Sequence, residues 1–258
     1  RCQPNNMIKN FSGLSTGQKI LVAALIFLAA QGVVWGLSEP DAHFMPDSNE
    51  YIAVAAEISR GGDGSEVSTV EALFGARRQP GYILLLAIGE TLIGDPVVFV
   101  LPLQIIALLV MGLVTASLSE AFLPGTRLLA FVVMVFNPNS FALAQIVLPA
   151  TPYSLCILMA LWAIWRGAVL GLWKYGMLAG LFLTAAYLFR TDAKYLALIL
   201  PIWIPLLAVV CKVKLSIWRL FLVGIVATTM FLGFSQVWSN SKGDFLAAKG
   251  EIVVNSVP

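Results

Sequence analysis

The residues best suited to chemistry gather in one long polar stretch, residues 38–80, of a chain that is otherwise mostly apolar. This stretch holds three arginines, the only histidine (His43) and eight of the 14 carboxylates. A carboxylate can accept a proton from an attacking group, and an arginine can grip a phosphate through two hydrogen bonds. The reagents of any reaction are therefore expected here. The eight carboxylates are Glu39, Asp41, Asp47, Glu50, Glu57, Asp63, Glu66 and Glu71.

The composition indicates that this polar stretch belongs to a membrane protein. Hydrophobic residues make up 59% of the 258 residues and charged residues only 12%, too little polar surface to cover a water-soluble globule. The net charge of +2 is weak, and the basic residues stand singly at the ends of apolar runs, which argues against a nucleic-acid partner. The three cysteines show no metal-ligand spacing and are interpreted as structural. The predicted fold class is an all-α polytopic membrane protein.

The apolar runs predict about seven transmembrane helices. The first, residues 19–37, could also be a secretory signal peptide, but it is long for one and lacks an A-x-A cleavage site. Residues 82–93 would reach only about 18 Å of the roughly 30 Å hydrocarbon core, so they are predicted to be interfacial. The other six predicted spans are residues 97–118, 128–148, 150–165, 173–189, 195–210 and 217–238.

The distribution of basic residues gives the predicted topology. If residues 82–93 do not span, more basic residues fall on the side of the N-terminus than on the other side, and if they do span the bias reverses. The positive-inside tendency therefore places the N-terminus in the cytoplasm, with the loop 38–80 and the tail 239–258 outside. Residues 1–258 then form a single module, with its remaining helices in residues 81–238. The inner set is Arg127, Arg166, Lys174, Lys212, Lys214 and Arg219, and the outer set is Arg190, Lys194, Lys242 and Lys249.

Two features of the polar loop carry more than one interpretation. Asp47 and Glu50, followed by Tyr51 and Ala55, have helical spacing, which predicts a short amphipathic helix that begins near Asp47 with its apolar face on the membrane. Asp47 then either caps this helix or acts chemically. The pair Arg77 and Arg78, which precedes the interfacial run, either binds a phosphate or anchors the loop at headgroup level.

A proline also interrupts one predicted span. The sequence Asn137-Pro138-Asn139-Ser140 breaks the run 128–148. A proline within a span frees a backbone carbonyl that neighbouring groups must satisfy. This break is therefore either a packing kink or the lining of a cavity.

Three motifs together resemble the GT-C superfamily, the polytopic glycosyltransferases that use polyprenyl-phosphate sugars. The resemblance is nearest to the protein mannosyltransferase and aminoarabinose transferase type, and it covers residues 19–201 in the same order and spacing. The motifs are Pro46-Asp47-Ser48 with Tyr51 and Ala55, then Arg78-Gln79-Pro80-Gly81-Tyr82, and then residues 180–193 with Arg190-Thr191-Asp192-Ala193 before Leu200-Pro201.

The resemblance implies transfer of a sugar to a hydroxyl or amine at the outer face of a bacterial-type inner membrane. It implies Asp47 as the catalytic residue, and it leaves a divalent metal ion open as a cofactor. Arg190 and Asp192 have a simpler interpretation as a local ion pair. The predicted donor-phosphate residues are Arg77, Arg78, Arg190 and Lys194, and the predicted supporting residues are Glu50, Tyr51, Tyr82 and Asp192.

The chain also departs from the family pattern. Many relatives carry a Ser-Glu or Thr-Glu pair at the outer turn near Pro149, whereas Ala150-Thr151-Pro152-Tyr153 contains no carboxylate. Many also continue for several spans and a soluble domain, whereas this chain ends at Pro258. A second hypothesis is therefore a catalytically silent GT-C-like subunit of a larger membrane complex. A transporter is disfavoured, because charged residues are nearly absent from the span interiors.

Overall fold

The structure is a computed structural model that describes residues 14–60, 79–210 and 217–248. Within these ranges the chain forms ten α-helices and one short 3₁₀ helix and contains no strand, so the all-α prediction is confirmed there. The elements are α2 (Thr16–Leu37), η1 (Pro40–His43), α3 (Pro46–Arg60), α5 (Pro80–Ile93), α6 (Pro96–Phe122), α7 (Arg127–Phe136), α8 (Pro138–Leu143), α9 (Ala150–Leu170), α10 (Lys174–Phe189), α11 (Ala193–Val210) and α12 (Ile217–Ala248).

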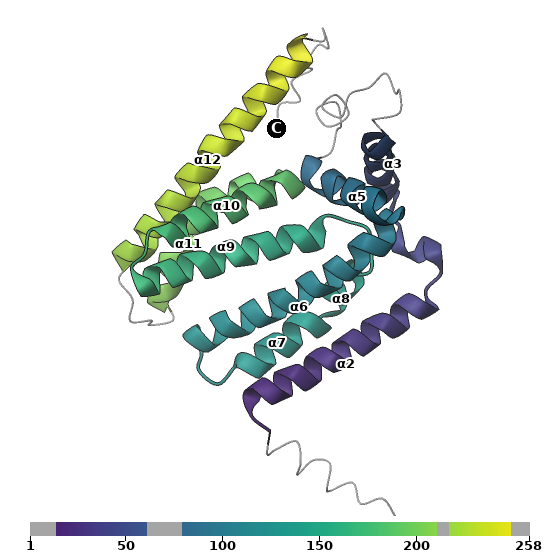
Figure 1. Cartoon of the computed structure of the whole chain (residues 1–258). Coiled ribbons are helices and arrows are strands. Elements are labelled where there is room, and N and C mark those ends of the chain that lie inside the picture. Colours follow the sequence, from purple (N-terminus) through teal and green to yellow (C-terminus); the bar gives the residue numbers. More distant parts are fainter. Residues whose placement is uncertain (1–13, 61–78, 211–216, 249–258) are drawn as a thin grey trace, which may run out of the picture.

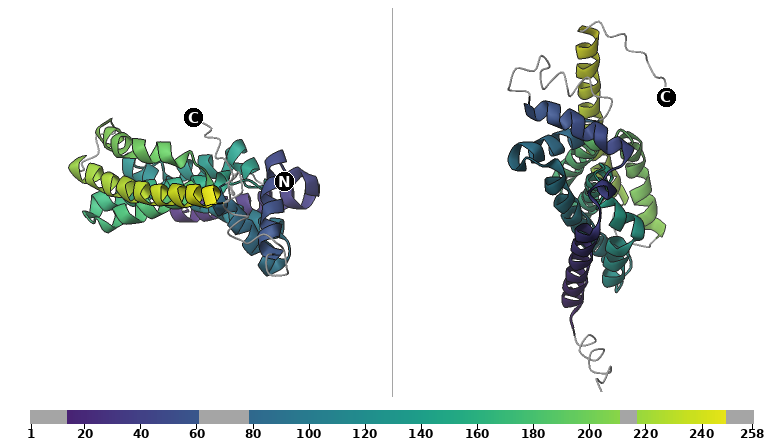
Figure 2. Two further views of the ribbon diagram at one scale, coloured as in Figure 1. Left: turned by 90° about the horizontal axis from the view of Figure 1, so that it is seen from above. Right: turned by 90° about the vertical axis from the view of Figure 1, so that its right-hand side faces the viewer.

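The longer helices lie side by side in a bundle, and two shorter helices cover one of its ends (Figure 1). Across the bundle, α2 packs on α7, α7 on α6, α6 on α9, α9 on α10 and α10 on α12. Helices α3 and α5 pack on each other at the end of the bundle where α2 ends and α6 begins. Figure 2 shows the same arrangement from two further directions. We call this end the α3 end, and we call the opposite end, with residues 123–126 and 171–173, the turn end.

Local sequence signals account for several of the helix boundaries. Ser15 caps α2 by accepting a hydrogen bond from Gln18 N, and the Gln18 side chain completes a capping box. The α5–α6 junction uses Gly94, at φ 77°, to end α5, and Asp95 Oδ1 accepts hydrogen bonds from Val97 N and Val98 N at 2.8 and 3.1 Å to begin α6. This junction turns the chain back sharply into the bundle.

Four helices in the described residues are long and apolar enough to cross a membrane, so the prediction of seven spans is wrong. They make this chain a multi-pass membrane protein. Helices α7 and α10 have 10 and 16 residues. Their lengths of about 15 and 24 Å fall short of the roughly 30 Å hydrocarbon core. The four candidates are Thr16–Leu37, Pro96–Phe122, Ala150–Leu170 and Trp218–Lys242.

The predicted span 128–148 is not one helix, because Pro138 divides it. The residue before a proline is driven out of the helical region, and Asn137 has φ −58° and ψ 124°. The Asn137 side chain then caps α8 by accepting hydrogen bonds from Asn139 N and Ser140 N at 2.9 and 3.3 Å. Helix α8 ends at Leu143, and residues 144–149 continue to α9 without a regular helix. The predicted break is confirmed, and its extent exceeds a kink.

Two glycines bring α10 and α12 into close contact. Gly176 and Gly180 are four residues apart, the spacing that places both on one face of α10. A Cβ atom would lie 2.9 Å from Val223 O at Gly176 and 2.9 Å from Ala227 O at Gly180. Only glycine therefore lets the two backbones approach this closely.

We expect Gly180→Ala to lower the thermal unfolding temperature of the protein in detergent micelles. The added methyl group meets a backbone oxygen that cannot rotate away, and such overpacking costs about 1–3 kcal/mol. Gly233→Ala in α12 is the matched control, because no atom lies within 4 Å of its Cβ position. This control should leave the unfolding temperature unchanged or raised. Equal responses of the two variants would contradict the close crossing.

Candidate functional site

A cavity of about 350 Å³ lies at the α3 end of the bundle. Its wall combines residues of α3, of the irregular segment before α9 and of the α10–α11 junction, so it unites parts of the chain more than 100 residues apart. Four of the predicted site residues line it together, namely Asp47, Tyr51, Arg190 and Asp192. Its size lies at the lower end of the range of small-molecule sites. The remaining lining residues are Gln79, Leu148, Pro149, Ala150, Phe189 and Thr191.

Asp47 is exposed in the first turn of α3. The helix begins at Pro46, so Asp47 is its second residue, and the predicted cap position for Asp47 is wrong. Proline is favoured at the first helical position because its fixed φ suits the helix and no N–H is needed there. The Asp47 carboxylate therefore lies in the positive field of the helix N-terminus while it lines the cavity.

The buried face of α3 packs on α5. Ser48, Tyr51 and Ala55 form this face, so the predicted amphipathic helix is confirmed. The Tyr51 ring packs edge-on against Tyr82, with ring centroids 5.3 Å apart. The prediction that the apolar face rests on the membrane is wrong, because α5 covers it. Glu50 is half-buried and is not among the residues that line the cavity.

Tyr82 does not line the cavity, but its ring packs against Tyr51, which does. Its side chain is fully buried, and its hydroxyl has no hydrogen-bond partner among the described residues. Burial, with a further contribution from Tyr51, raises the pKa of the Tyr82 phenol above its ordinary value. The phenol therefore stays neutral and serves as a packing partner of Tyr51.

Hydrogen bonds from η1 and α3 hold the irregular segment 144–149 against the cavity. The ring nitrogen Nδ1 of buried His43 lies 2.7 Å from Gln145 O, and the His43 carbonyl accepts from Val147 N at 2.9 Å. Buried Ser48 donates to Val147 O at 2.8 Å and accepts from Met45 N at 2.9 Å. The first turn of α3, which carries Asp47, is therefore fixed to segment 144–149, whose last two residues line the cavity.

Two glutamines from the long helices bind this region of the chain from the bundle side. Gln104 of α6 donates to Ile146 O of the segment at 3.0 Å, and Gln31 of α2 donates to Phe141 O of the preceding α8 at 3.3 Å. The Gln145 side chain in turn donates to the carbonyl and to the side-chain oxygen of Gln31. An unpaired backbone group in hydrocarbon costs several kcal/mol, so an irregular segment there needs such partners.

Sequence reasoning missed this network. The available signal was the presence of uncharged polar residues, Gln31 and Gln104, inside long apolar runs. Both are almost completely buried, and a buried amide requires partners. The identity of those partners was not predictable, because they lie 110 and 42 residues away in the chain.

Arg190 forms an ion pair with Asp192. Arg190 Nη2 lies 2.7 Å from Asp192 Oδ2, so the interpretation of the two residues as a local ion pair is confirmed. The Arg190 guanidinium also lies over the Tyr153 ring, with Cζ 5.6 Å from its centroid. The two paired side chains are 47% and 54% exposed, and an exposed pair of this kind is worth only about 0–1 kcal/mol. A bound anion can therefore displace Asp192 at little cost.

Of the other predicted phosphate-binding residues, Lys194 is the one that the structure describes. Lys194 is exposed and is not among the lining residues, and its Nζ lies 4.9 Å from the centroid of the neighbouring Tyr195 ring. Arg77 and Arg78 lie outside the described residues. Gln79, which sequence reasoning did not single out, does line the cavity, and its Oε1 is buried without a hydrogen-bond partner in the described part of the chain.

The structure assigns no metal ligands to this site. In the ranges that it describes, no three His, Cys, Asp or Glu residues are grouped so that they could hold a metal ion. The divalent ion left open by the sequence therefore has no ligand set within these ranges.

Comparison of the chain with protein-family models, with curated proteins and with solved structures found no match. The likeness to the GT-C superfamily therefore rests on the sequence motifs alone and stays a prediction.

We expect Ser48→Ala to lower the thermal unfolding temperature of the detergent-solubilised protein. The substitution leaves Val147 O and Met45 N without their side-chain partner, and an unsatisfied buried polar group costs about 1–3 kcal/mol. Ser59→Ala is the matched control in the same helix, because Ser59 bonds only to Ala56 O one turn back. Equal unfolding temperatures for the two variants would show that the hydrogen bond from Ser48 to Val147 O, which joins α3 to residues 144–149, adds no stability.

Proposed function

We propose that this protein is a membrane glycosyltransferase that moves a sugar from a polyprenyl-phosphate donor to an acceptor hydroxyl or amine. The observation that carries the proposal is the cavity at the α3 end, which Asp47 and Arg190 line together from different parts of the fold. A carboxylate and a guanidinium facing one cavity are the two groups that such a transfer needs.

In the proposed reaction, Asp47 acts as the general base. The acceptor oxygen or nitrogen attacks the anomeric carbon and forms the new glycosidic bond, while its proton passes to the Asp47 carboxylate. The bond between the anomeric carbon and the phosphate oxygen breaks, and the polyprenyl phosphate leaves with the electron pair. The exposed position of Asp47 at the cavity wall makes it accessible to an acceptor.

Arg190 binds the donor phosphate in this proposal. Its guanidinium exchanges the weak, half-exposed contact with Asp192 for a charge-assisted contact with the phosphate. Leu148 and Phe189 supply apolar surface beside it, which suits the first isoprene units of the donor.

The charge distribution supports the α3 end as the outer, extracytoplasmic end of an inner-membrane protein. Within the described ranges the turn end carries more basic than acidic residues. Its acidic residue is Glu120, and its basic residues include Arg127, Arg166, Lys174 and Arg219. Acidic residues of η1, α3 and the α5–α6 junction lie at the α3 end. Cytoplasmic ends of membrane helices carry the excess of Lys and Arg.

A second candidate is a catalytically silent GT-C-like subunit of a larger membrane complex. It is favoured by the Arg190–Asp192 contact, which leaves the cavity with two carboxylates and one guanidinium, and by the absence of a carboxylate in residues 150–153. Stoichiometric partner chains over the α3 end of the purified protein would support this candidate, whereas a copurified prenyl-phosphate lipid would support the transferase.

We expect Asp47→Asn to abolish sugar transfer while the protein still inserts and keeps its thermal stability. An amide has nearly the size of a carboxylate but cannot take a proton, and loss of a general base costs on the order of 10² to 10⁴ in rate. Glu57→Gln is the matched control, because Glu57 is exposed on the same helix and does not line the cavity. Transfer is measured with purified protein and radiolabelled polyprenyl-phosphate sugars. Near wild-type transfer by Asp47→Asn would remove the proposed base.

We expect Arg190→Gln to raise the KM for the polyprenyl-phosphate donor about tenfold or more, because a hydrogen bond to a charged group is worth about 1.5–3 kcal/mol. Arg60→Gln removes the same charge from the exposed end of α3, outside the cavity, and should leave this KM unchanged. Steady-state kinetics over a range of donor concentrations checks both variants. Matched KM values for Arg190→Gln and wild type would exclude Arg190 from phosphate binding.

A further inference from the structure

A second cavity, of about 190 Å³, lies at the turn end of the bundle, far from the site of the proposed transfer. Residues of α9, α12 and the α9–α10 junction line it. One of these residues is charged, Arg219, and the others are apolar or glycine. The full lining is Gly167, Gly171, Trp173, Arg219, Leu222, Val223 and Val226.

Two glycines of α9 and its C-terminal end line this cavity. Gly171 ends α9 at φ 67°, and a Cβ atom there would lie 3.6 Å from Arg219 Nη1. A Cβ atom at Gly167 would lie 2.9 Å from the Tyr175 Cβ atom and 3.0 Å from Val223 Cγ1, so Gly167 lets α9 pack closely on these side chains. At Gly171 the Arg219 guanidinium therefore faces backbone that carries no side chain.

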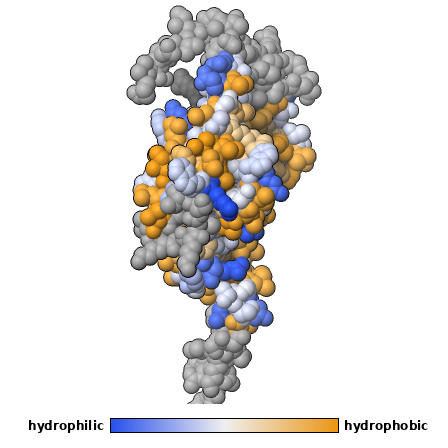
Figure 3. Space-filling model, turned by 90° about the vertical axis from the view of Figure 1, so that its left-hand side faces the viewer, coloured by the Kyte–Doolittle hydropathy of each residue, from blue (hydrophilic) through white to orange (hydrophobic). Residues whose placement is uncertain are grey.

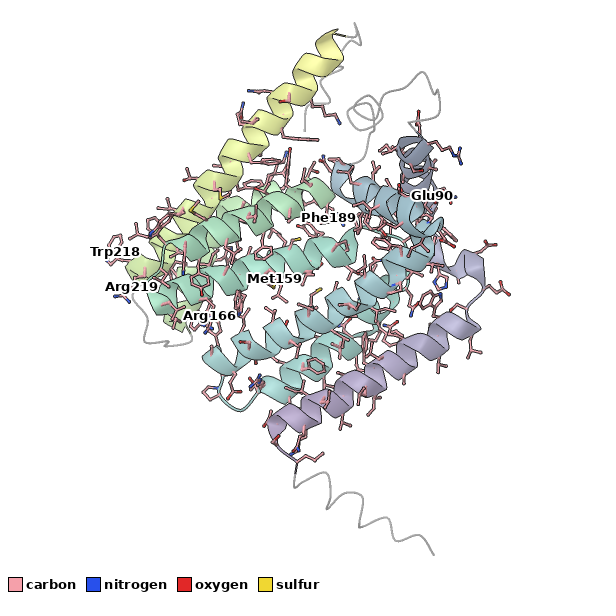
Figure 4. The ribbon with its side chains drawn as sticks, viewed as in Figure 1. Glu90, Met159, Arg166, Phe189, Trp218 and Arg219 are labelled. Atoms are coloured by element: carbon pink, nitrogen blue, oxygen red, sulfur yellow. The ribbon has the colours of Figure 1, made fainter. Side chains whose placement is uncertain are left out.

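Two further cations are chain neighbours of lining residues, because Arg166 precedes Gly167 and Lys174 follows Trp173. Arg166 and Lys174 are both exposed, and each lies over an aromatic ring, with Arg166 Cζ 5.7 Å from the Trp162 centroid and Lys174 Nζ 6.0 Å from the Tyr175 centroid. Figure 4 shows Arg166 and Arg219 at the same end of the bundle, opposite Phe189 and Glu90.

No carboxylate in the described residues neutralises these three cations. Among the described residues at the turn end, Glu120 is acidic. Both of its carboxylate oxygens lie 3.1 Å from Gly125 N in the α6–α7 turn. The ion pair Arg190–Asp192 lies at the other end of the molecule. The turn-end cavity is therefore electrostatically positive.

Exposed tryptophans place this cavity at the level of the lipid headgroups. Trp173 and Trp218 are 68% and 73% exposed at the turn end, and tryptophan is enriched at membrane–water interfaces. Figure 3 looks onto this side of the molecule and shows hydrophilic residues surrounded by hydrophobic ones. A ligand here meets both the interface and the hydrocarbon.

We infer that this cavity binds an anionic phospholipid from the cytoplasmic leaflet. Arg219 grips the lipid phosphate, Arg166 and Lys174 add attraction for the net negative headgroup, and an acyl chain lies along Leu222 and Val226. Basic pockets between membrane helices are suited to anionic headgroups, and guanidinium groups bind phosphate through two hydrogen bonds. A zwitterionic lipid such as phosphatidylcholine carries a cationic ammonium group, which the three cations repel. This inference does not depend on the proposed transfer reaction.

Native mass spectrometry of the full chain in detergent, titrated with phosphatidylglycerol or phosphatidylcholine, tests the inference. Wild type should bind phosphatidylglycerol about tenfold more tightly than phosphatidylcholine. Arg219→Gln should bind phosphatidylglycerol about tenfold more weakly than wild type, the loss expected when a hydrogen bond to a charged group is removed. Arg127→Gln is the matched control, because Arg127 is an exposed cation at the same end that does not line the cavity. Its affinity should stay within twofold of wild type.

A second variant separates binding in the cavity from attraction to the surface. Val226→Phe fills the cavity without changing the charge, so it should also weaken phosphatidylglycerol binding, whereas glycerol 1-phosphate should not displace the lipid at equal concentration. The inference would be overturned if Arg219→Gln and Arg127→Gln lost equal affinity, or if wild type bound the two lipids equally well. Unchanged phosphatidylglycerol binding by Val226→Phe, or displacement of the lipid by glycerol 1-phosphate, would also overturn it.

Discussion

The arrangement of this protein depends on the hydrogen bonds of an irregular backbone segment between membrane helices. Pro138 ends the helical path of α7, and residues 144–149 form no regular helix, so the carbonyls of Gln145, Ile146 and Val147 need other partners. Hydrocarbon offers these groups no partner, so side chains must do so. His43, Ser48 and Gln104 pair with backbone groups of this segment, and Gln31 of α2 accepts hydrogen bonds from the Gln145 side chain. The break therefore joins α2, η1, α3 and α6 into one unit.

The position of the α3-end cavity follows from that unit. Ser48 is fixed to Val147, so the adjacent Asp47 is held beside Leu148 and Pro149, which continue into α9. The α10–α11 junction, with Arg190, closes the other side, and the close contact of α10 with α12 fixes the helix that leads to it. The same bundle presents a positive cavity around Arg219 at its turn end, so its two ends offer chemically different sites.

Sequence reasoning predicted what composition and local chemistry determine. The all-α membrane class followed from the apolar content, the break followed from Pro138, and the ordered motifs grouped Asp47, Arg190 and Asp192, which one cavity unites. The number of spans was wrong because Pro138 divides the run 128–148 and because α10, with 16 residues, is too short. The face of α3 was misassigned because α5, and not lipid, covers it. Contacts between residues a hundred positions apart, such as His43 with Gln145, leave no local signal.

The central claim is that the α3-end cavity holds a polyprenyl phosphate beside Asp47 and Arg190. Photo-crosslinking with a polyprenyl phosphate that carries a diazirine on its first isoprene unit, followed by peptide mass spectrometry, tests it most directly. The account predicts labelling of residues 148–150 and of Phe189, competed away by the unlabelled lipid phosphate. Labelling confined to other parts of the bundle, or labelling of these residues that the unlabelled lipid does not reduce, would contradict it.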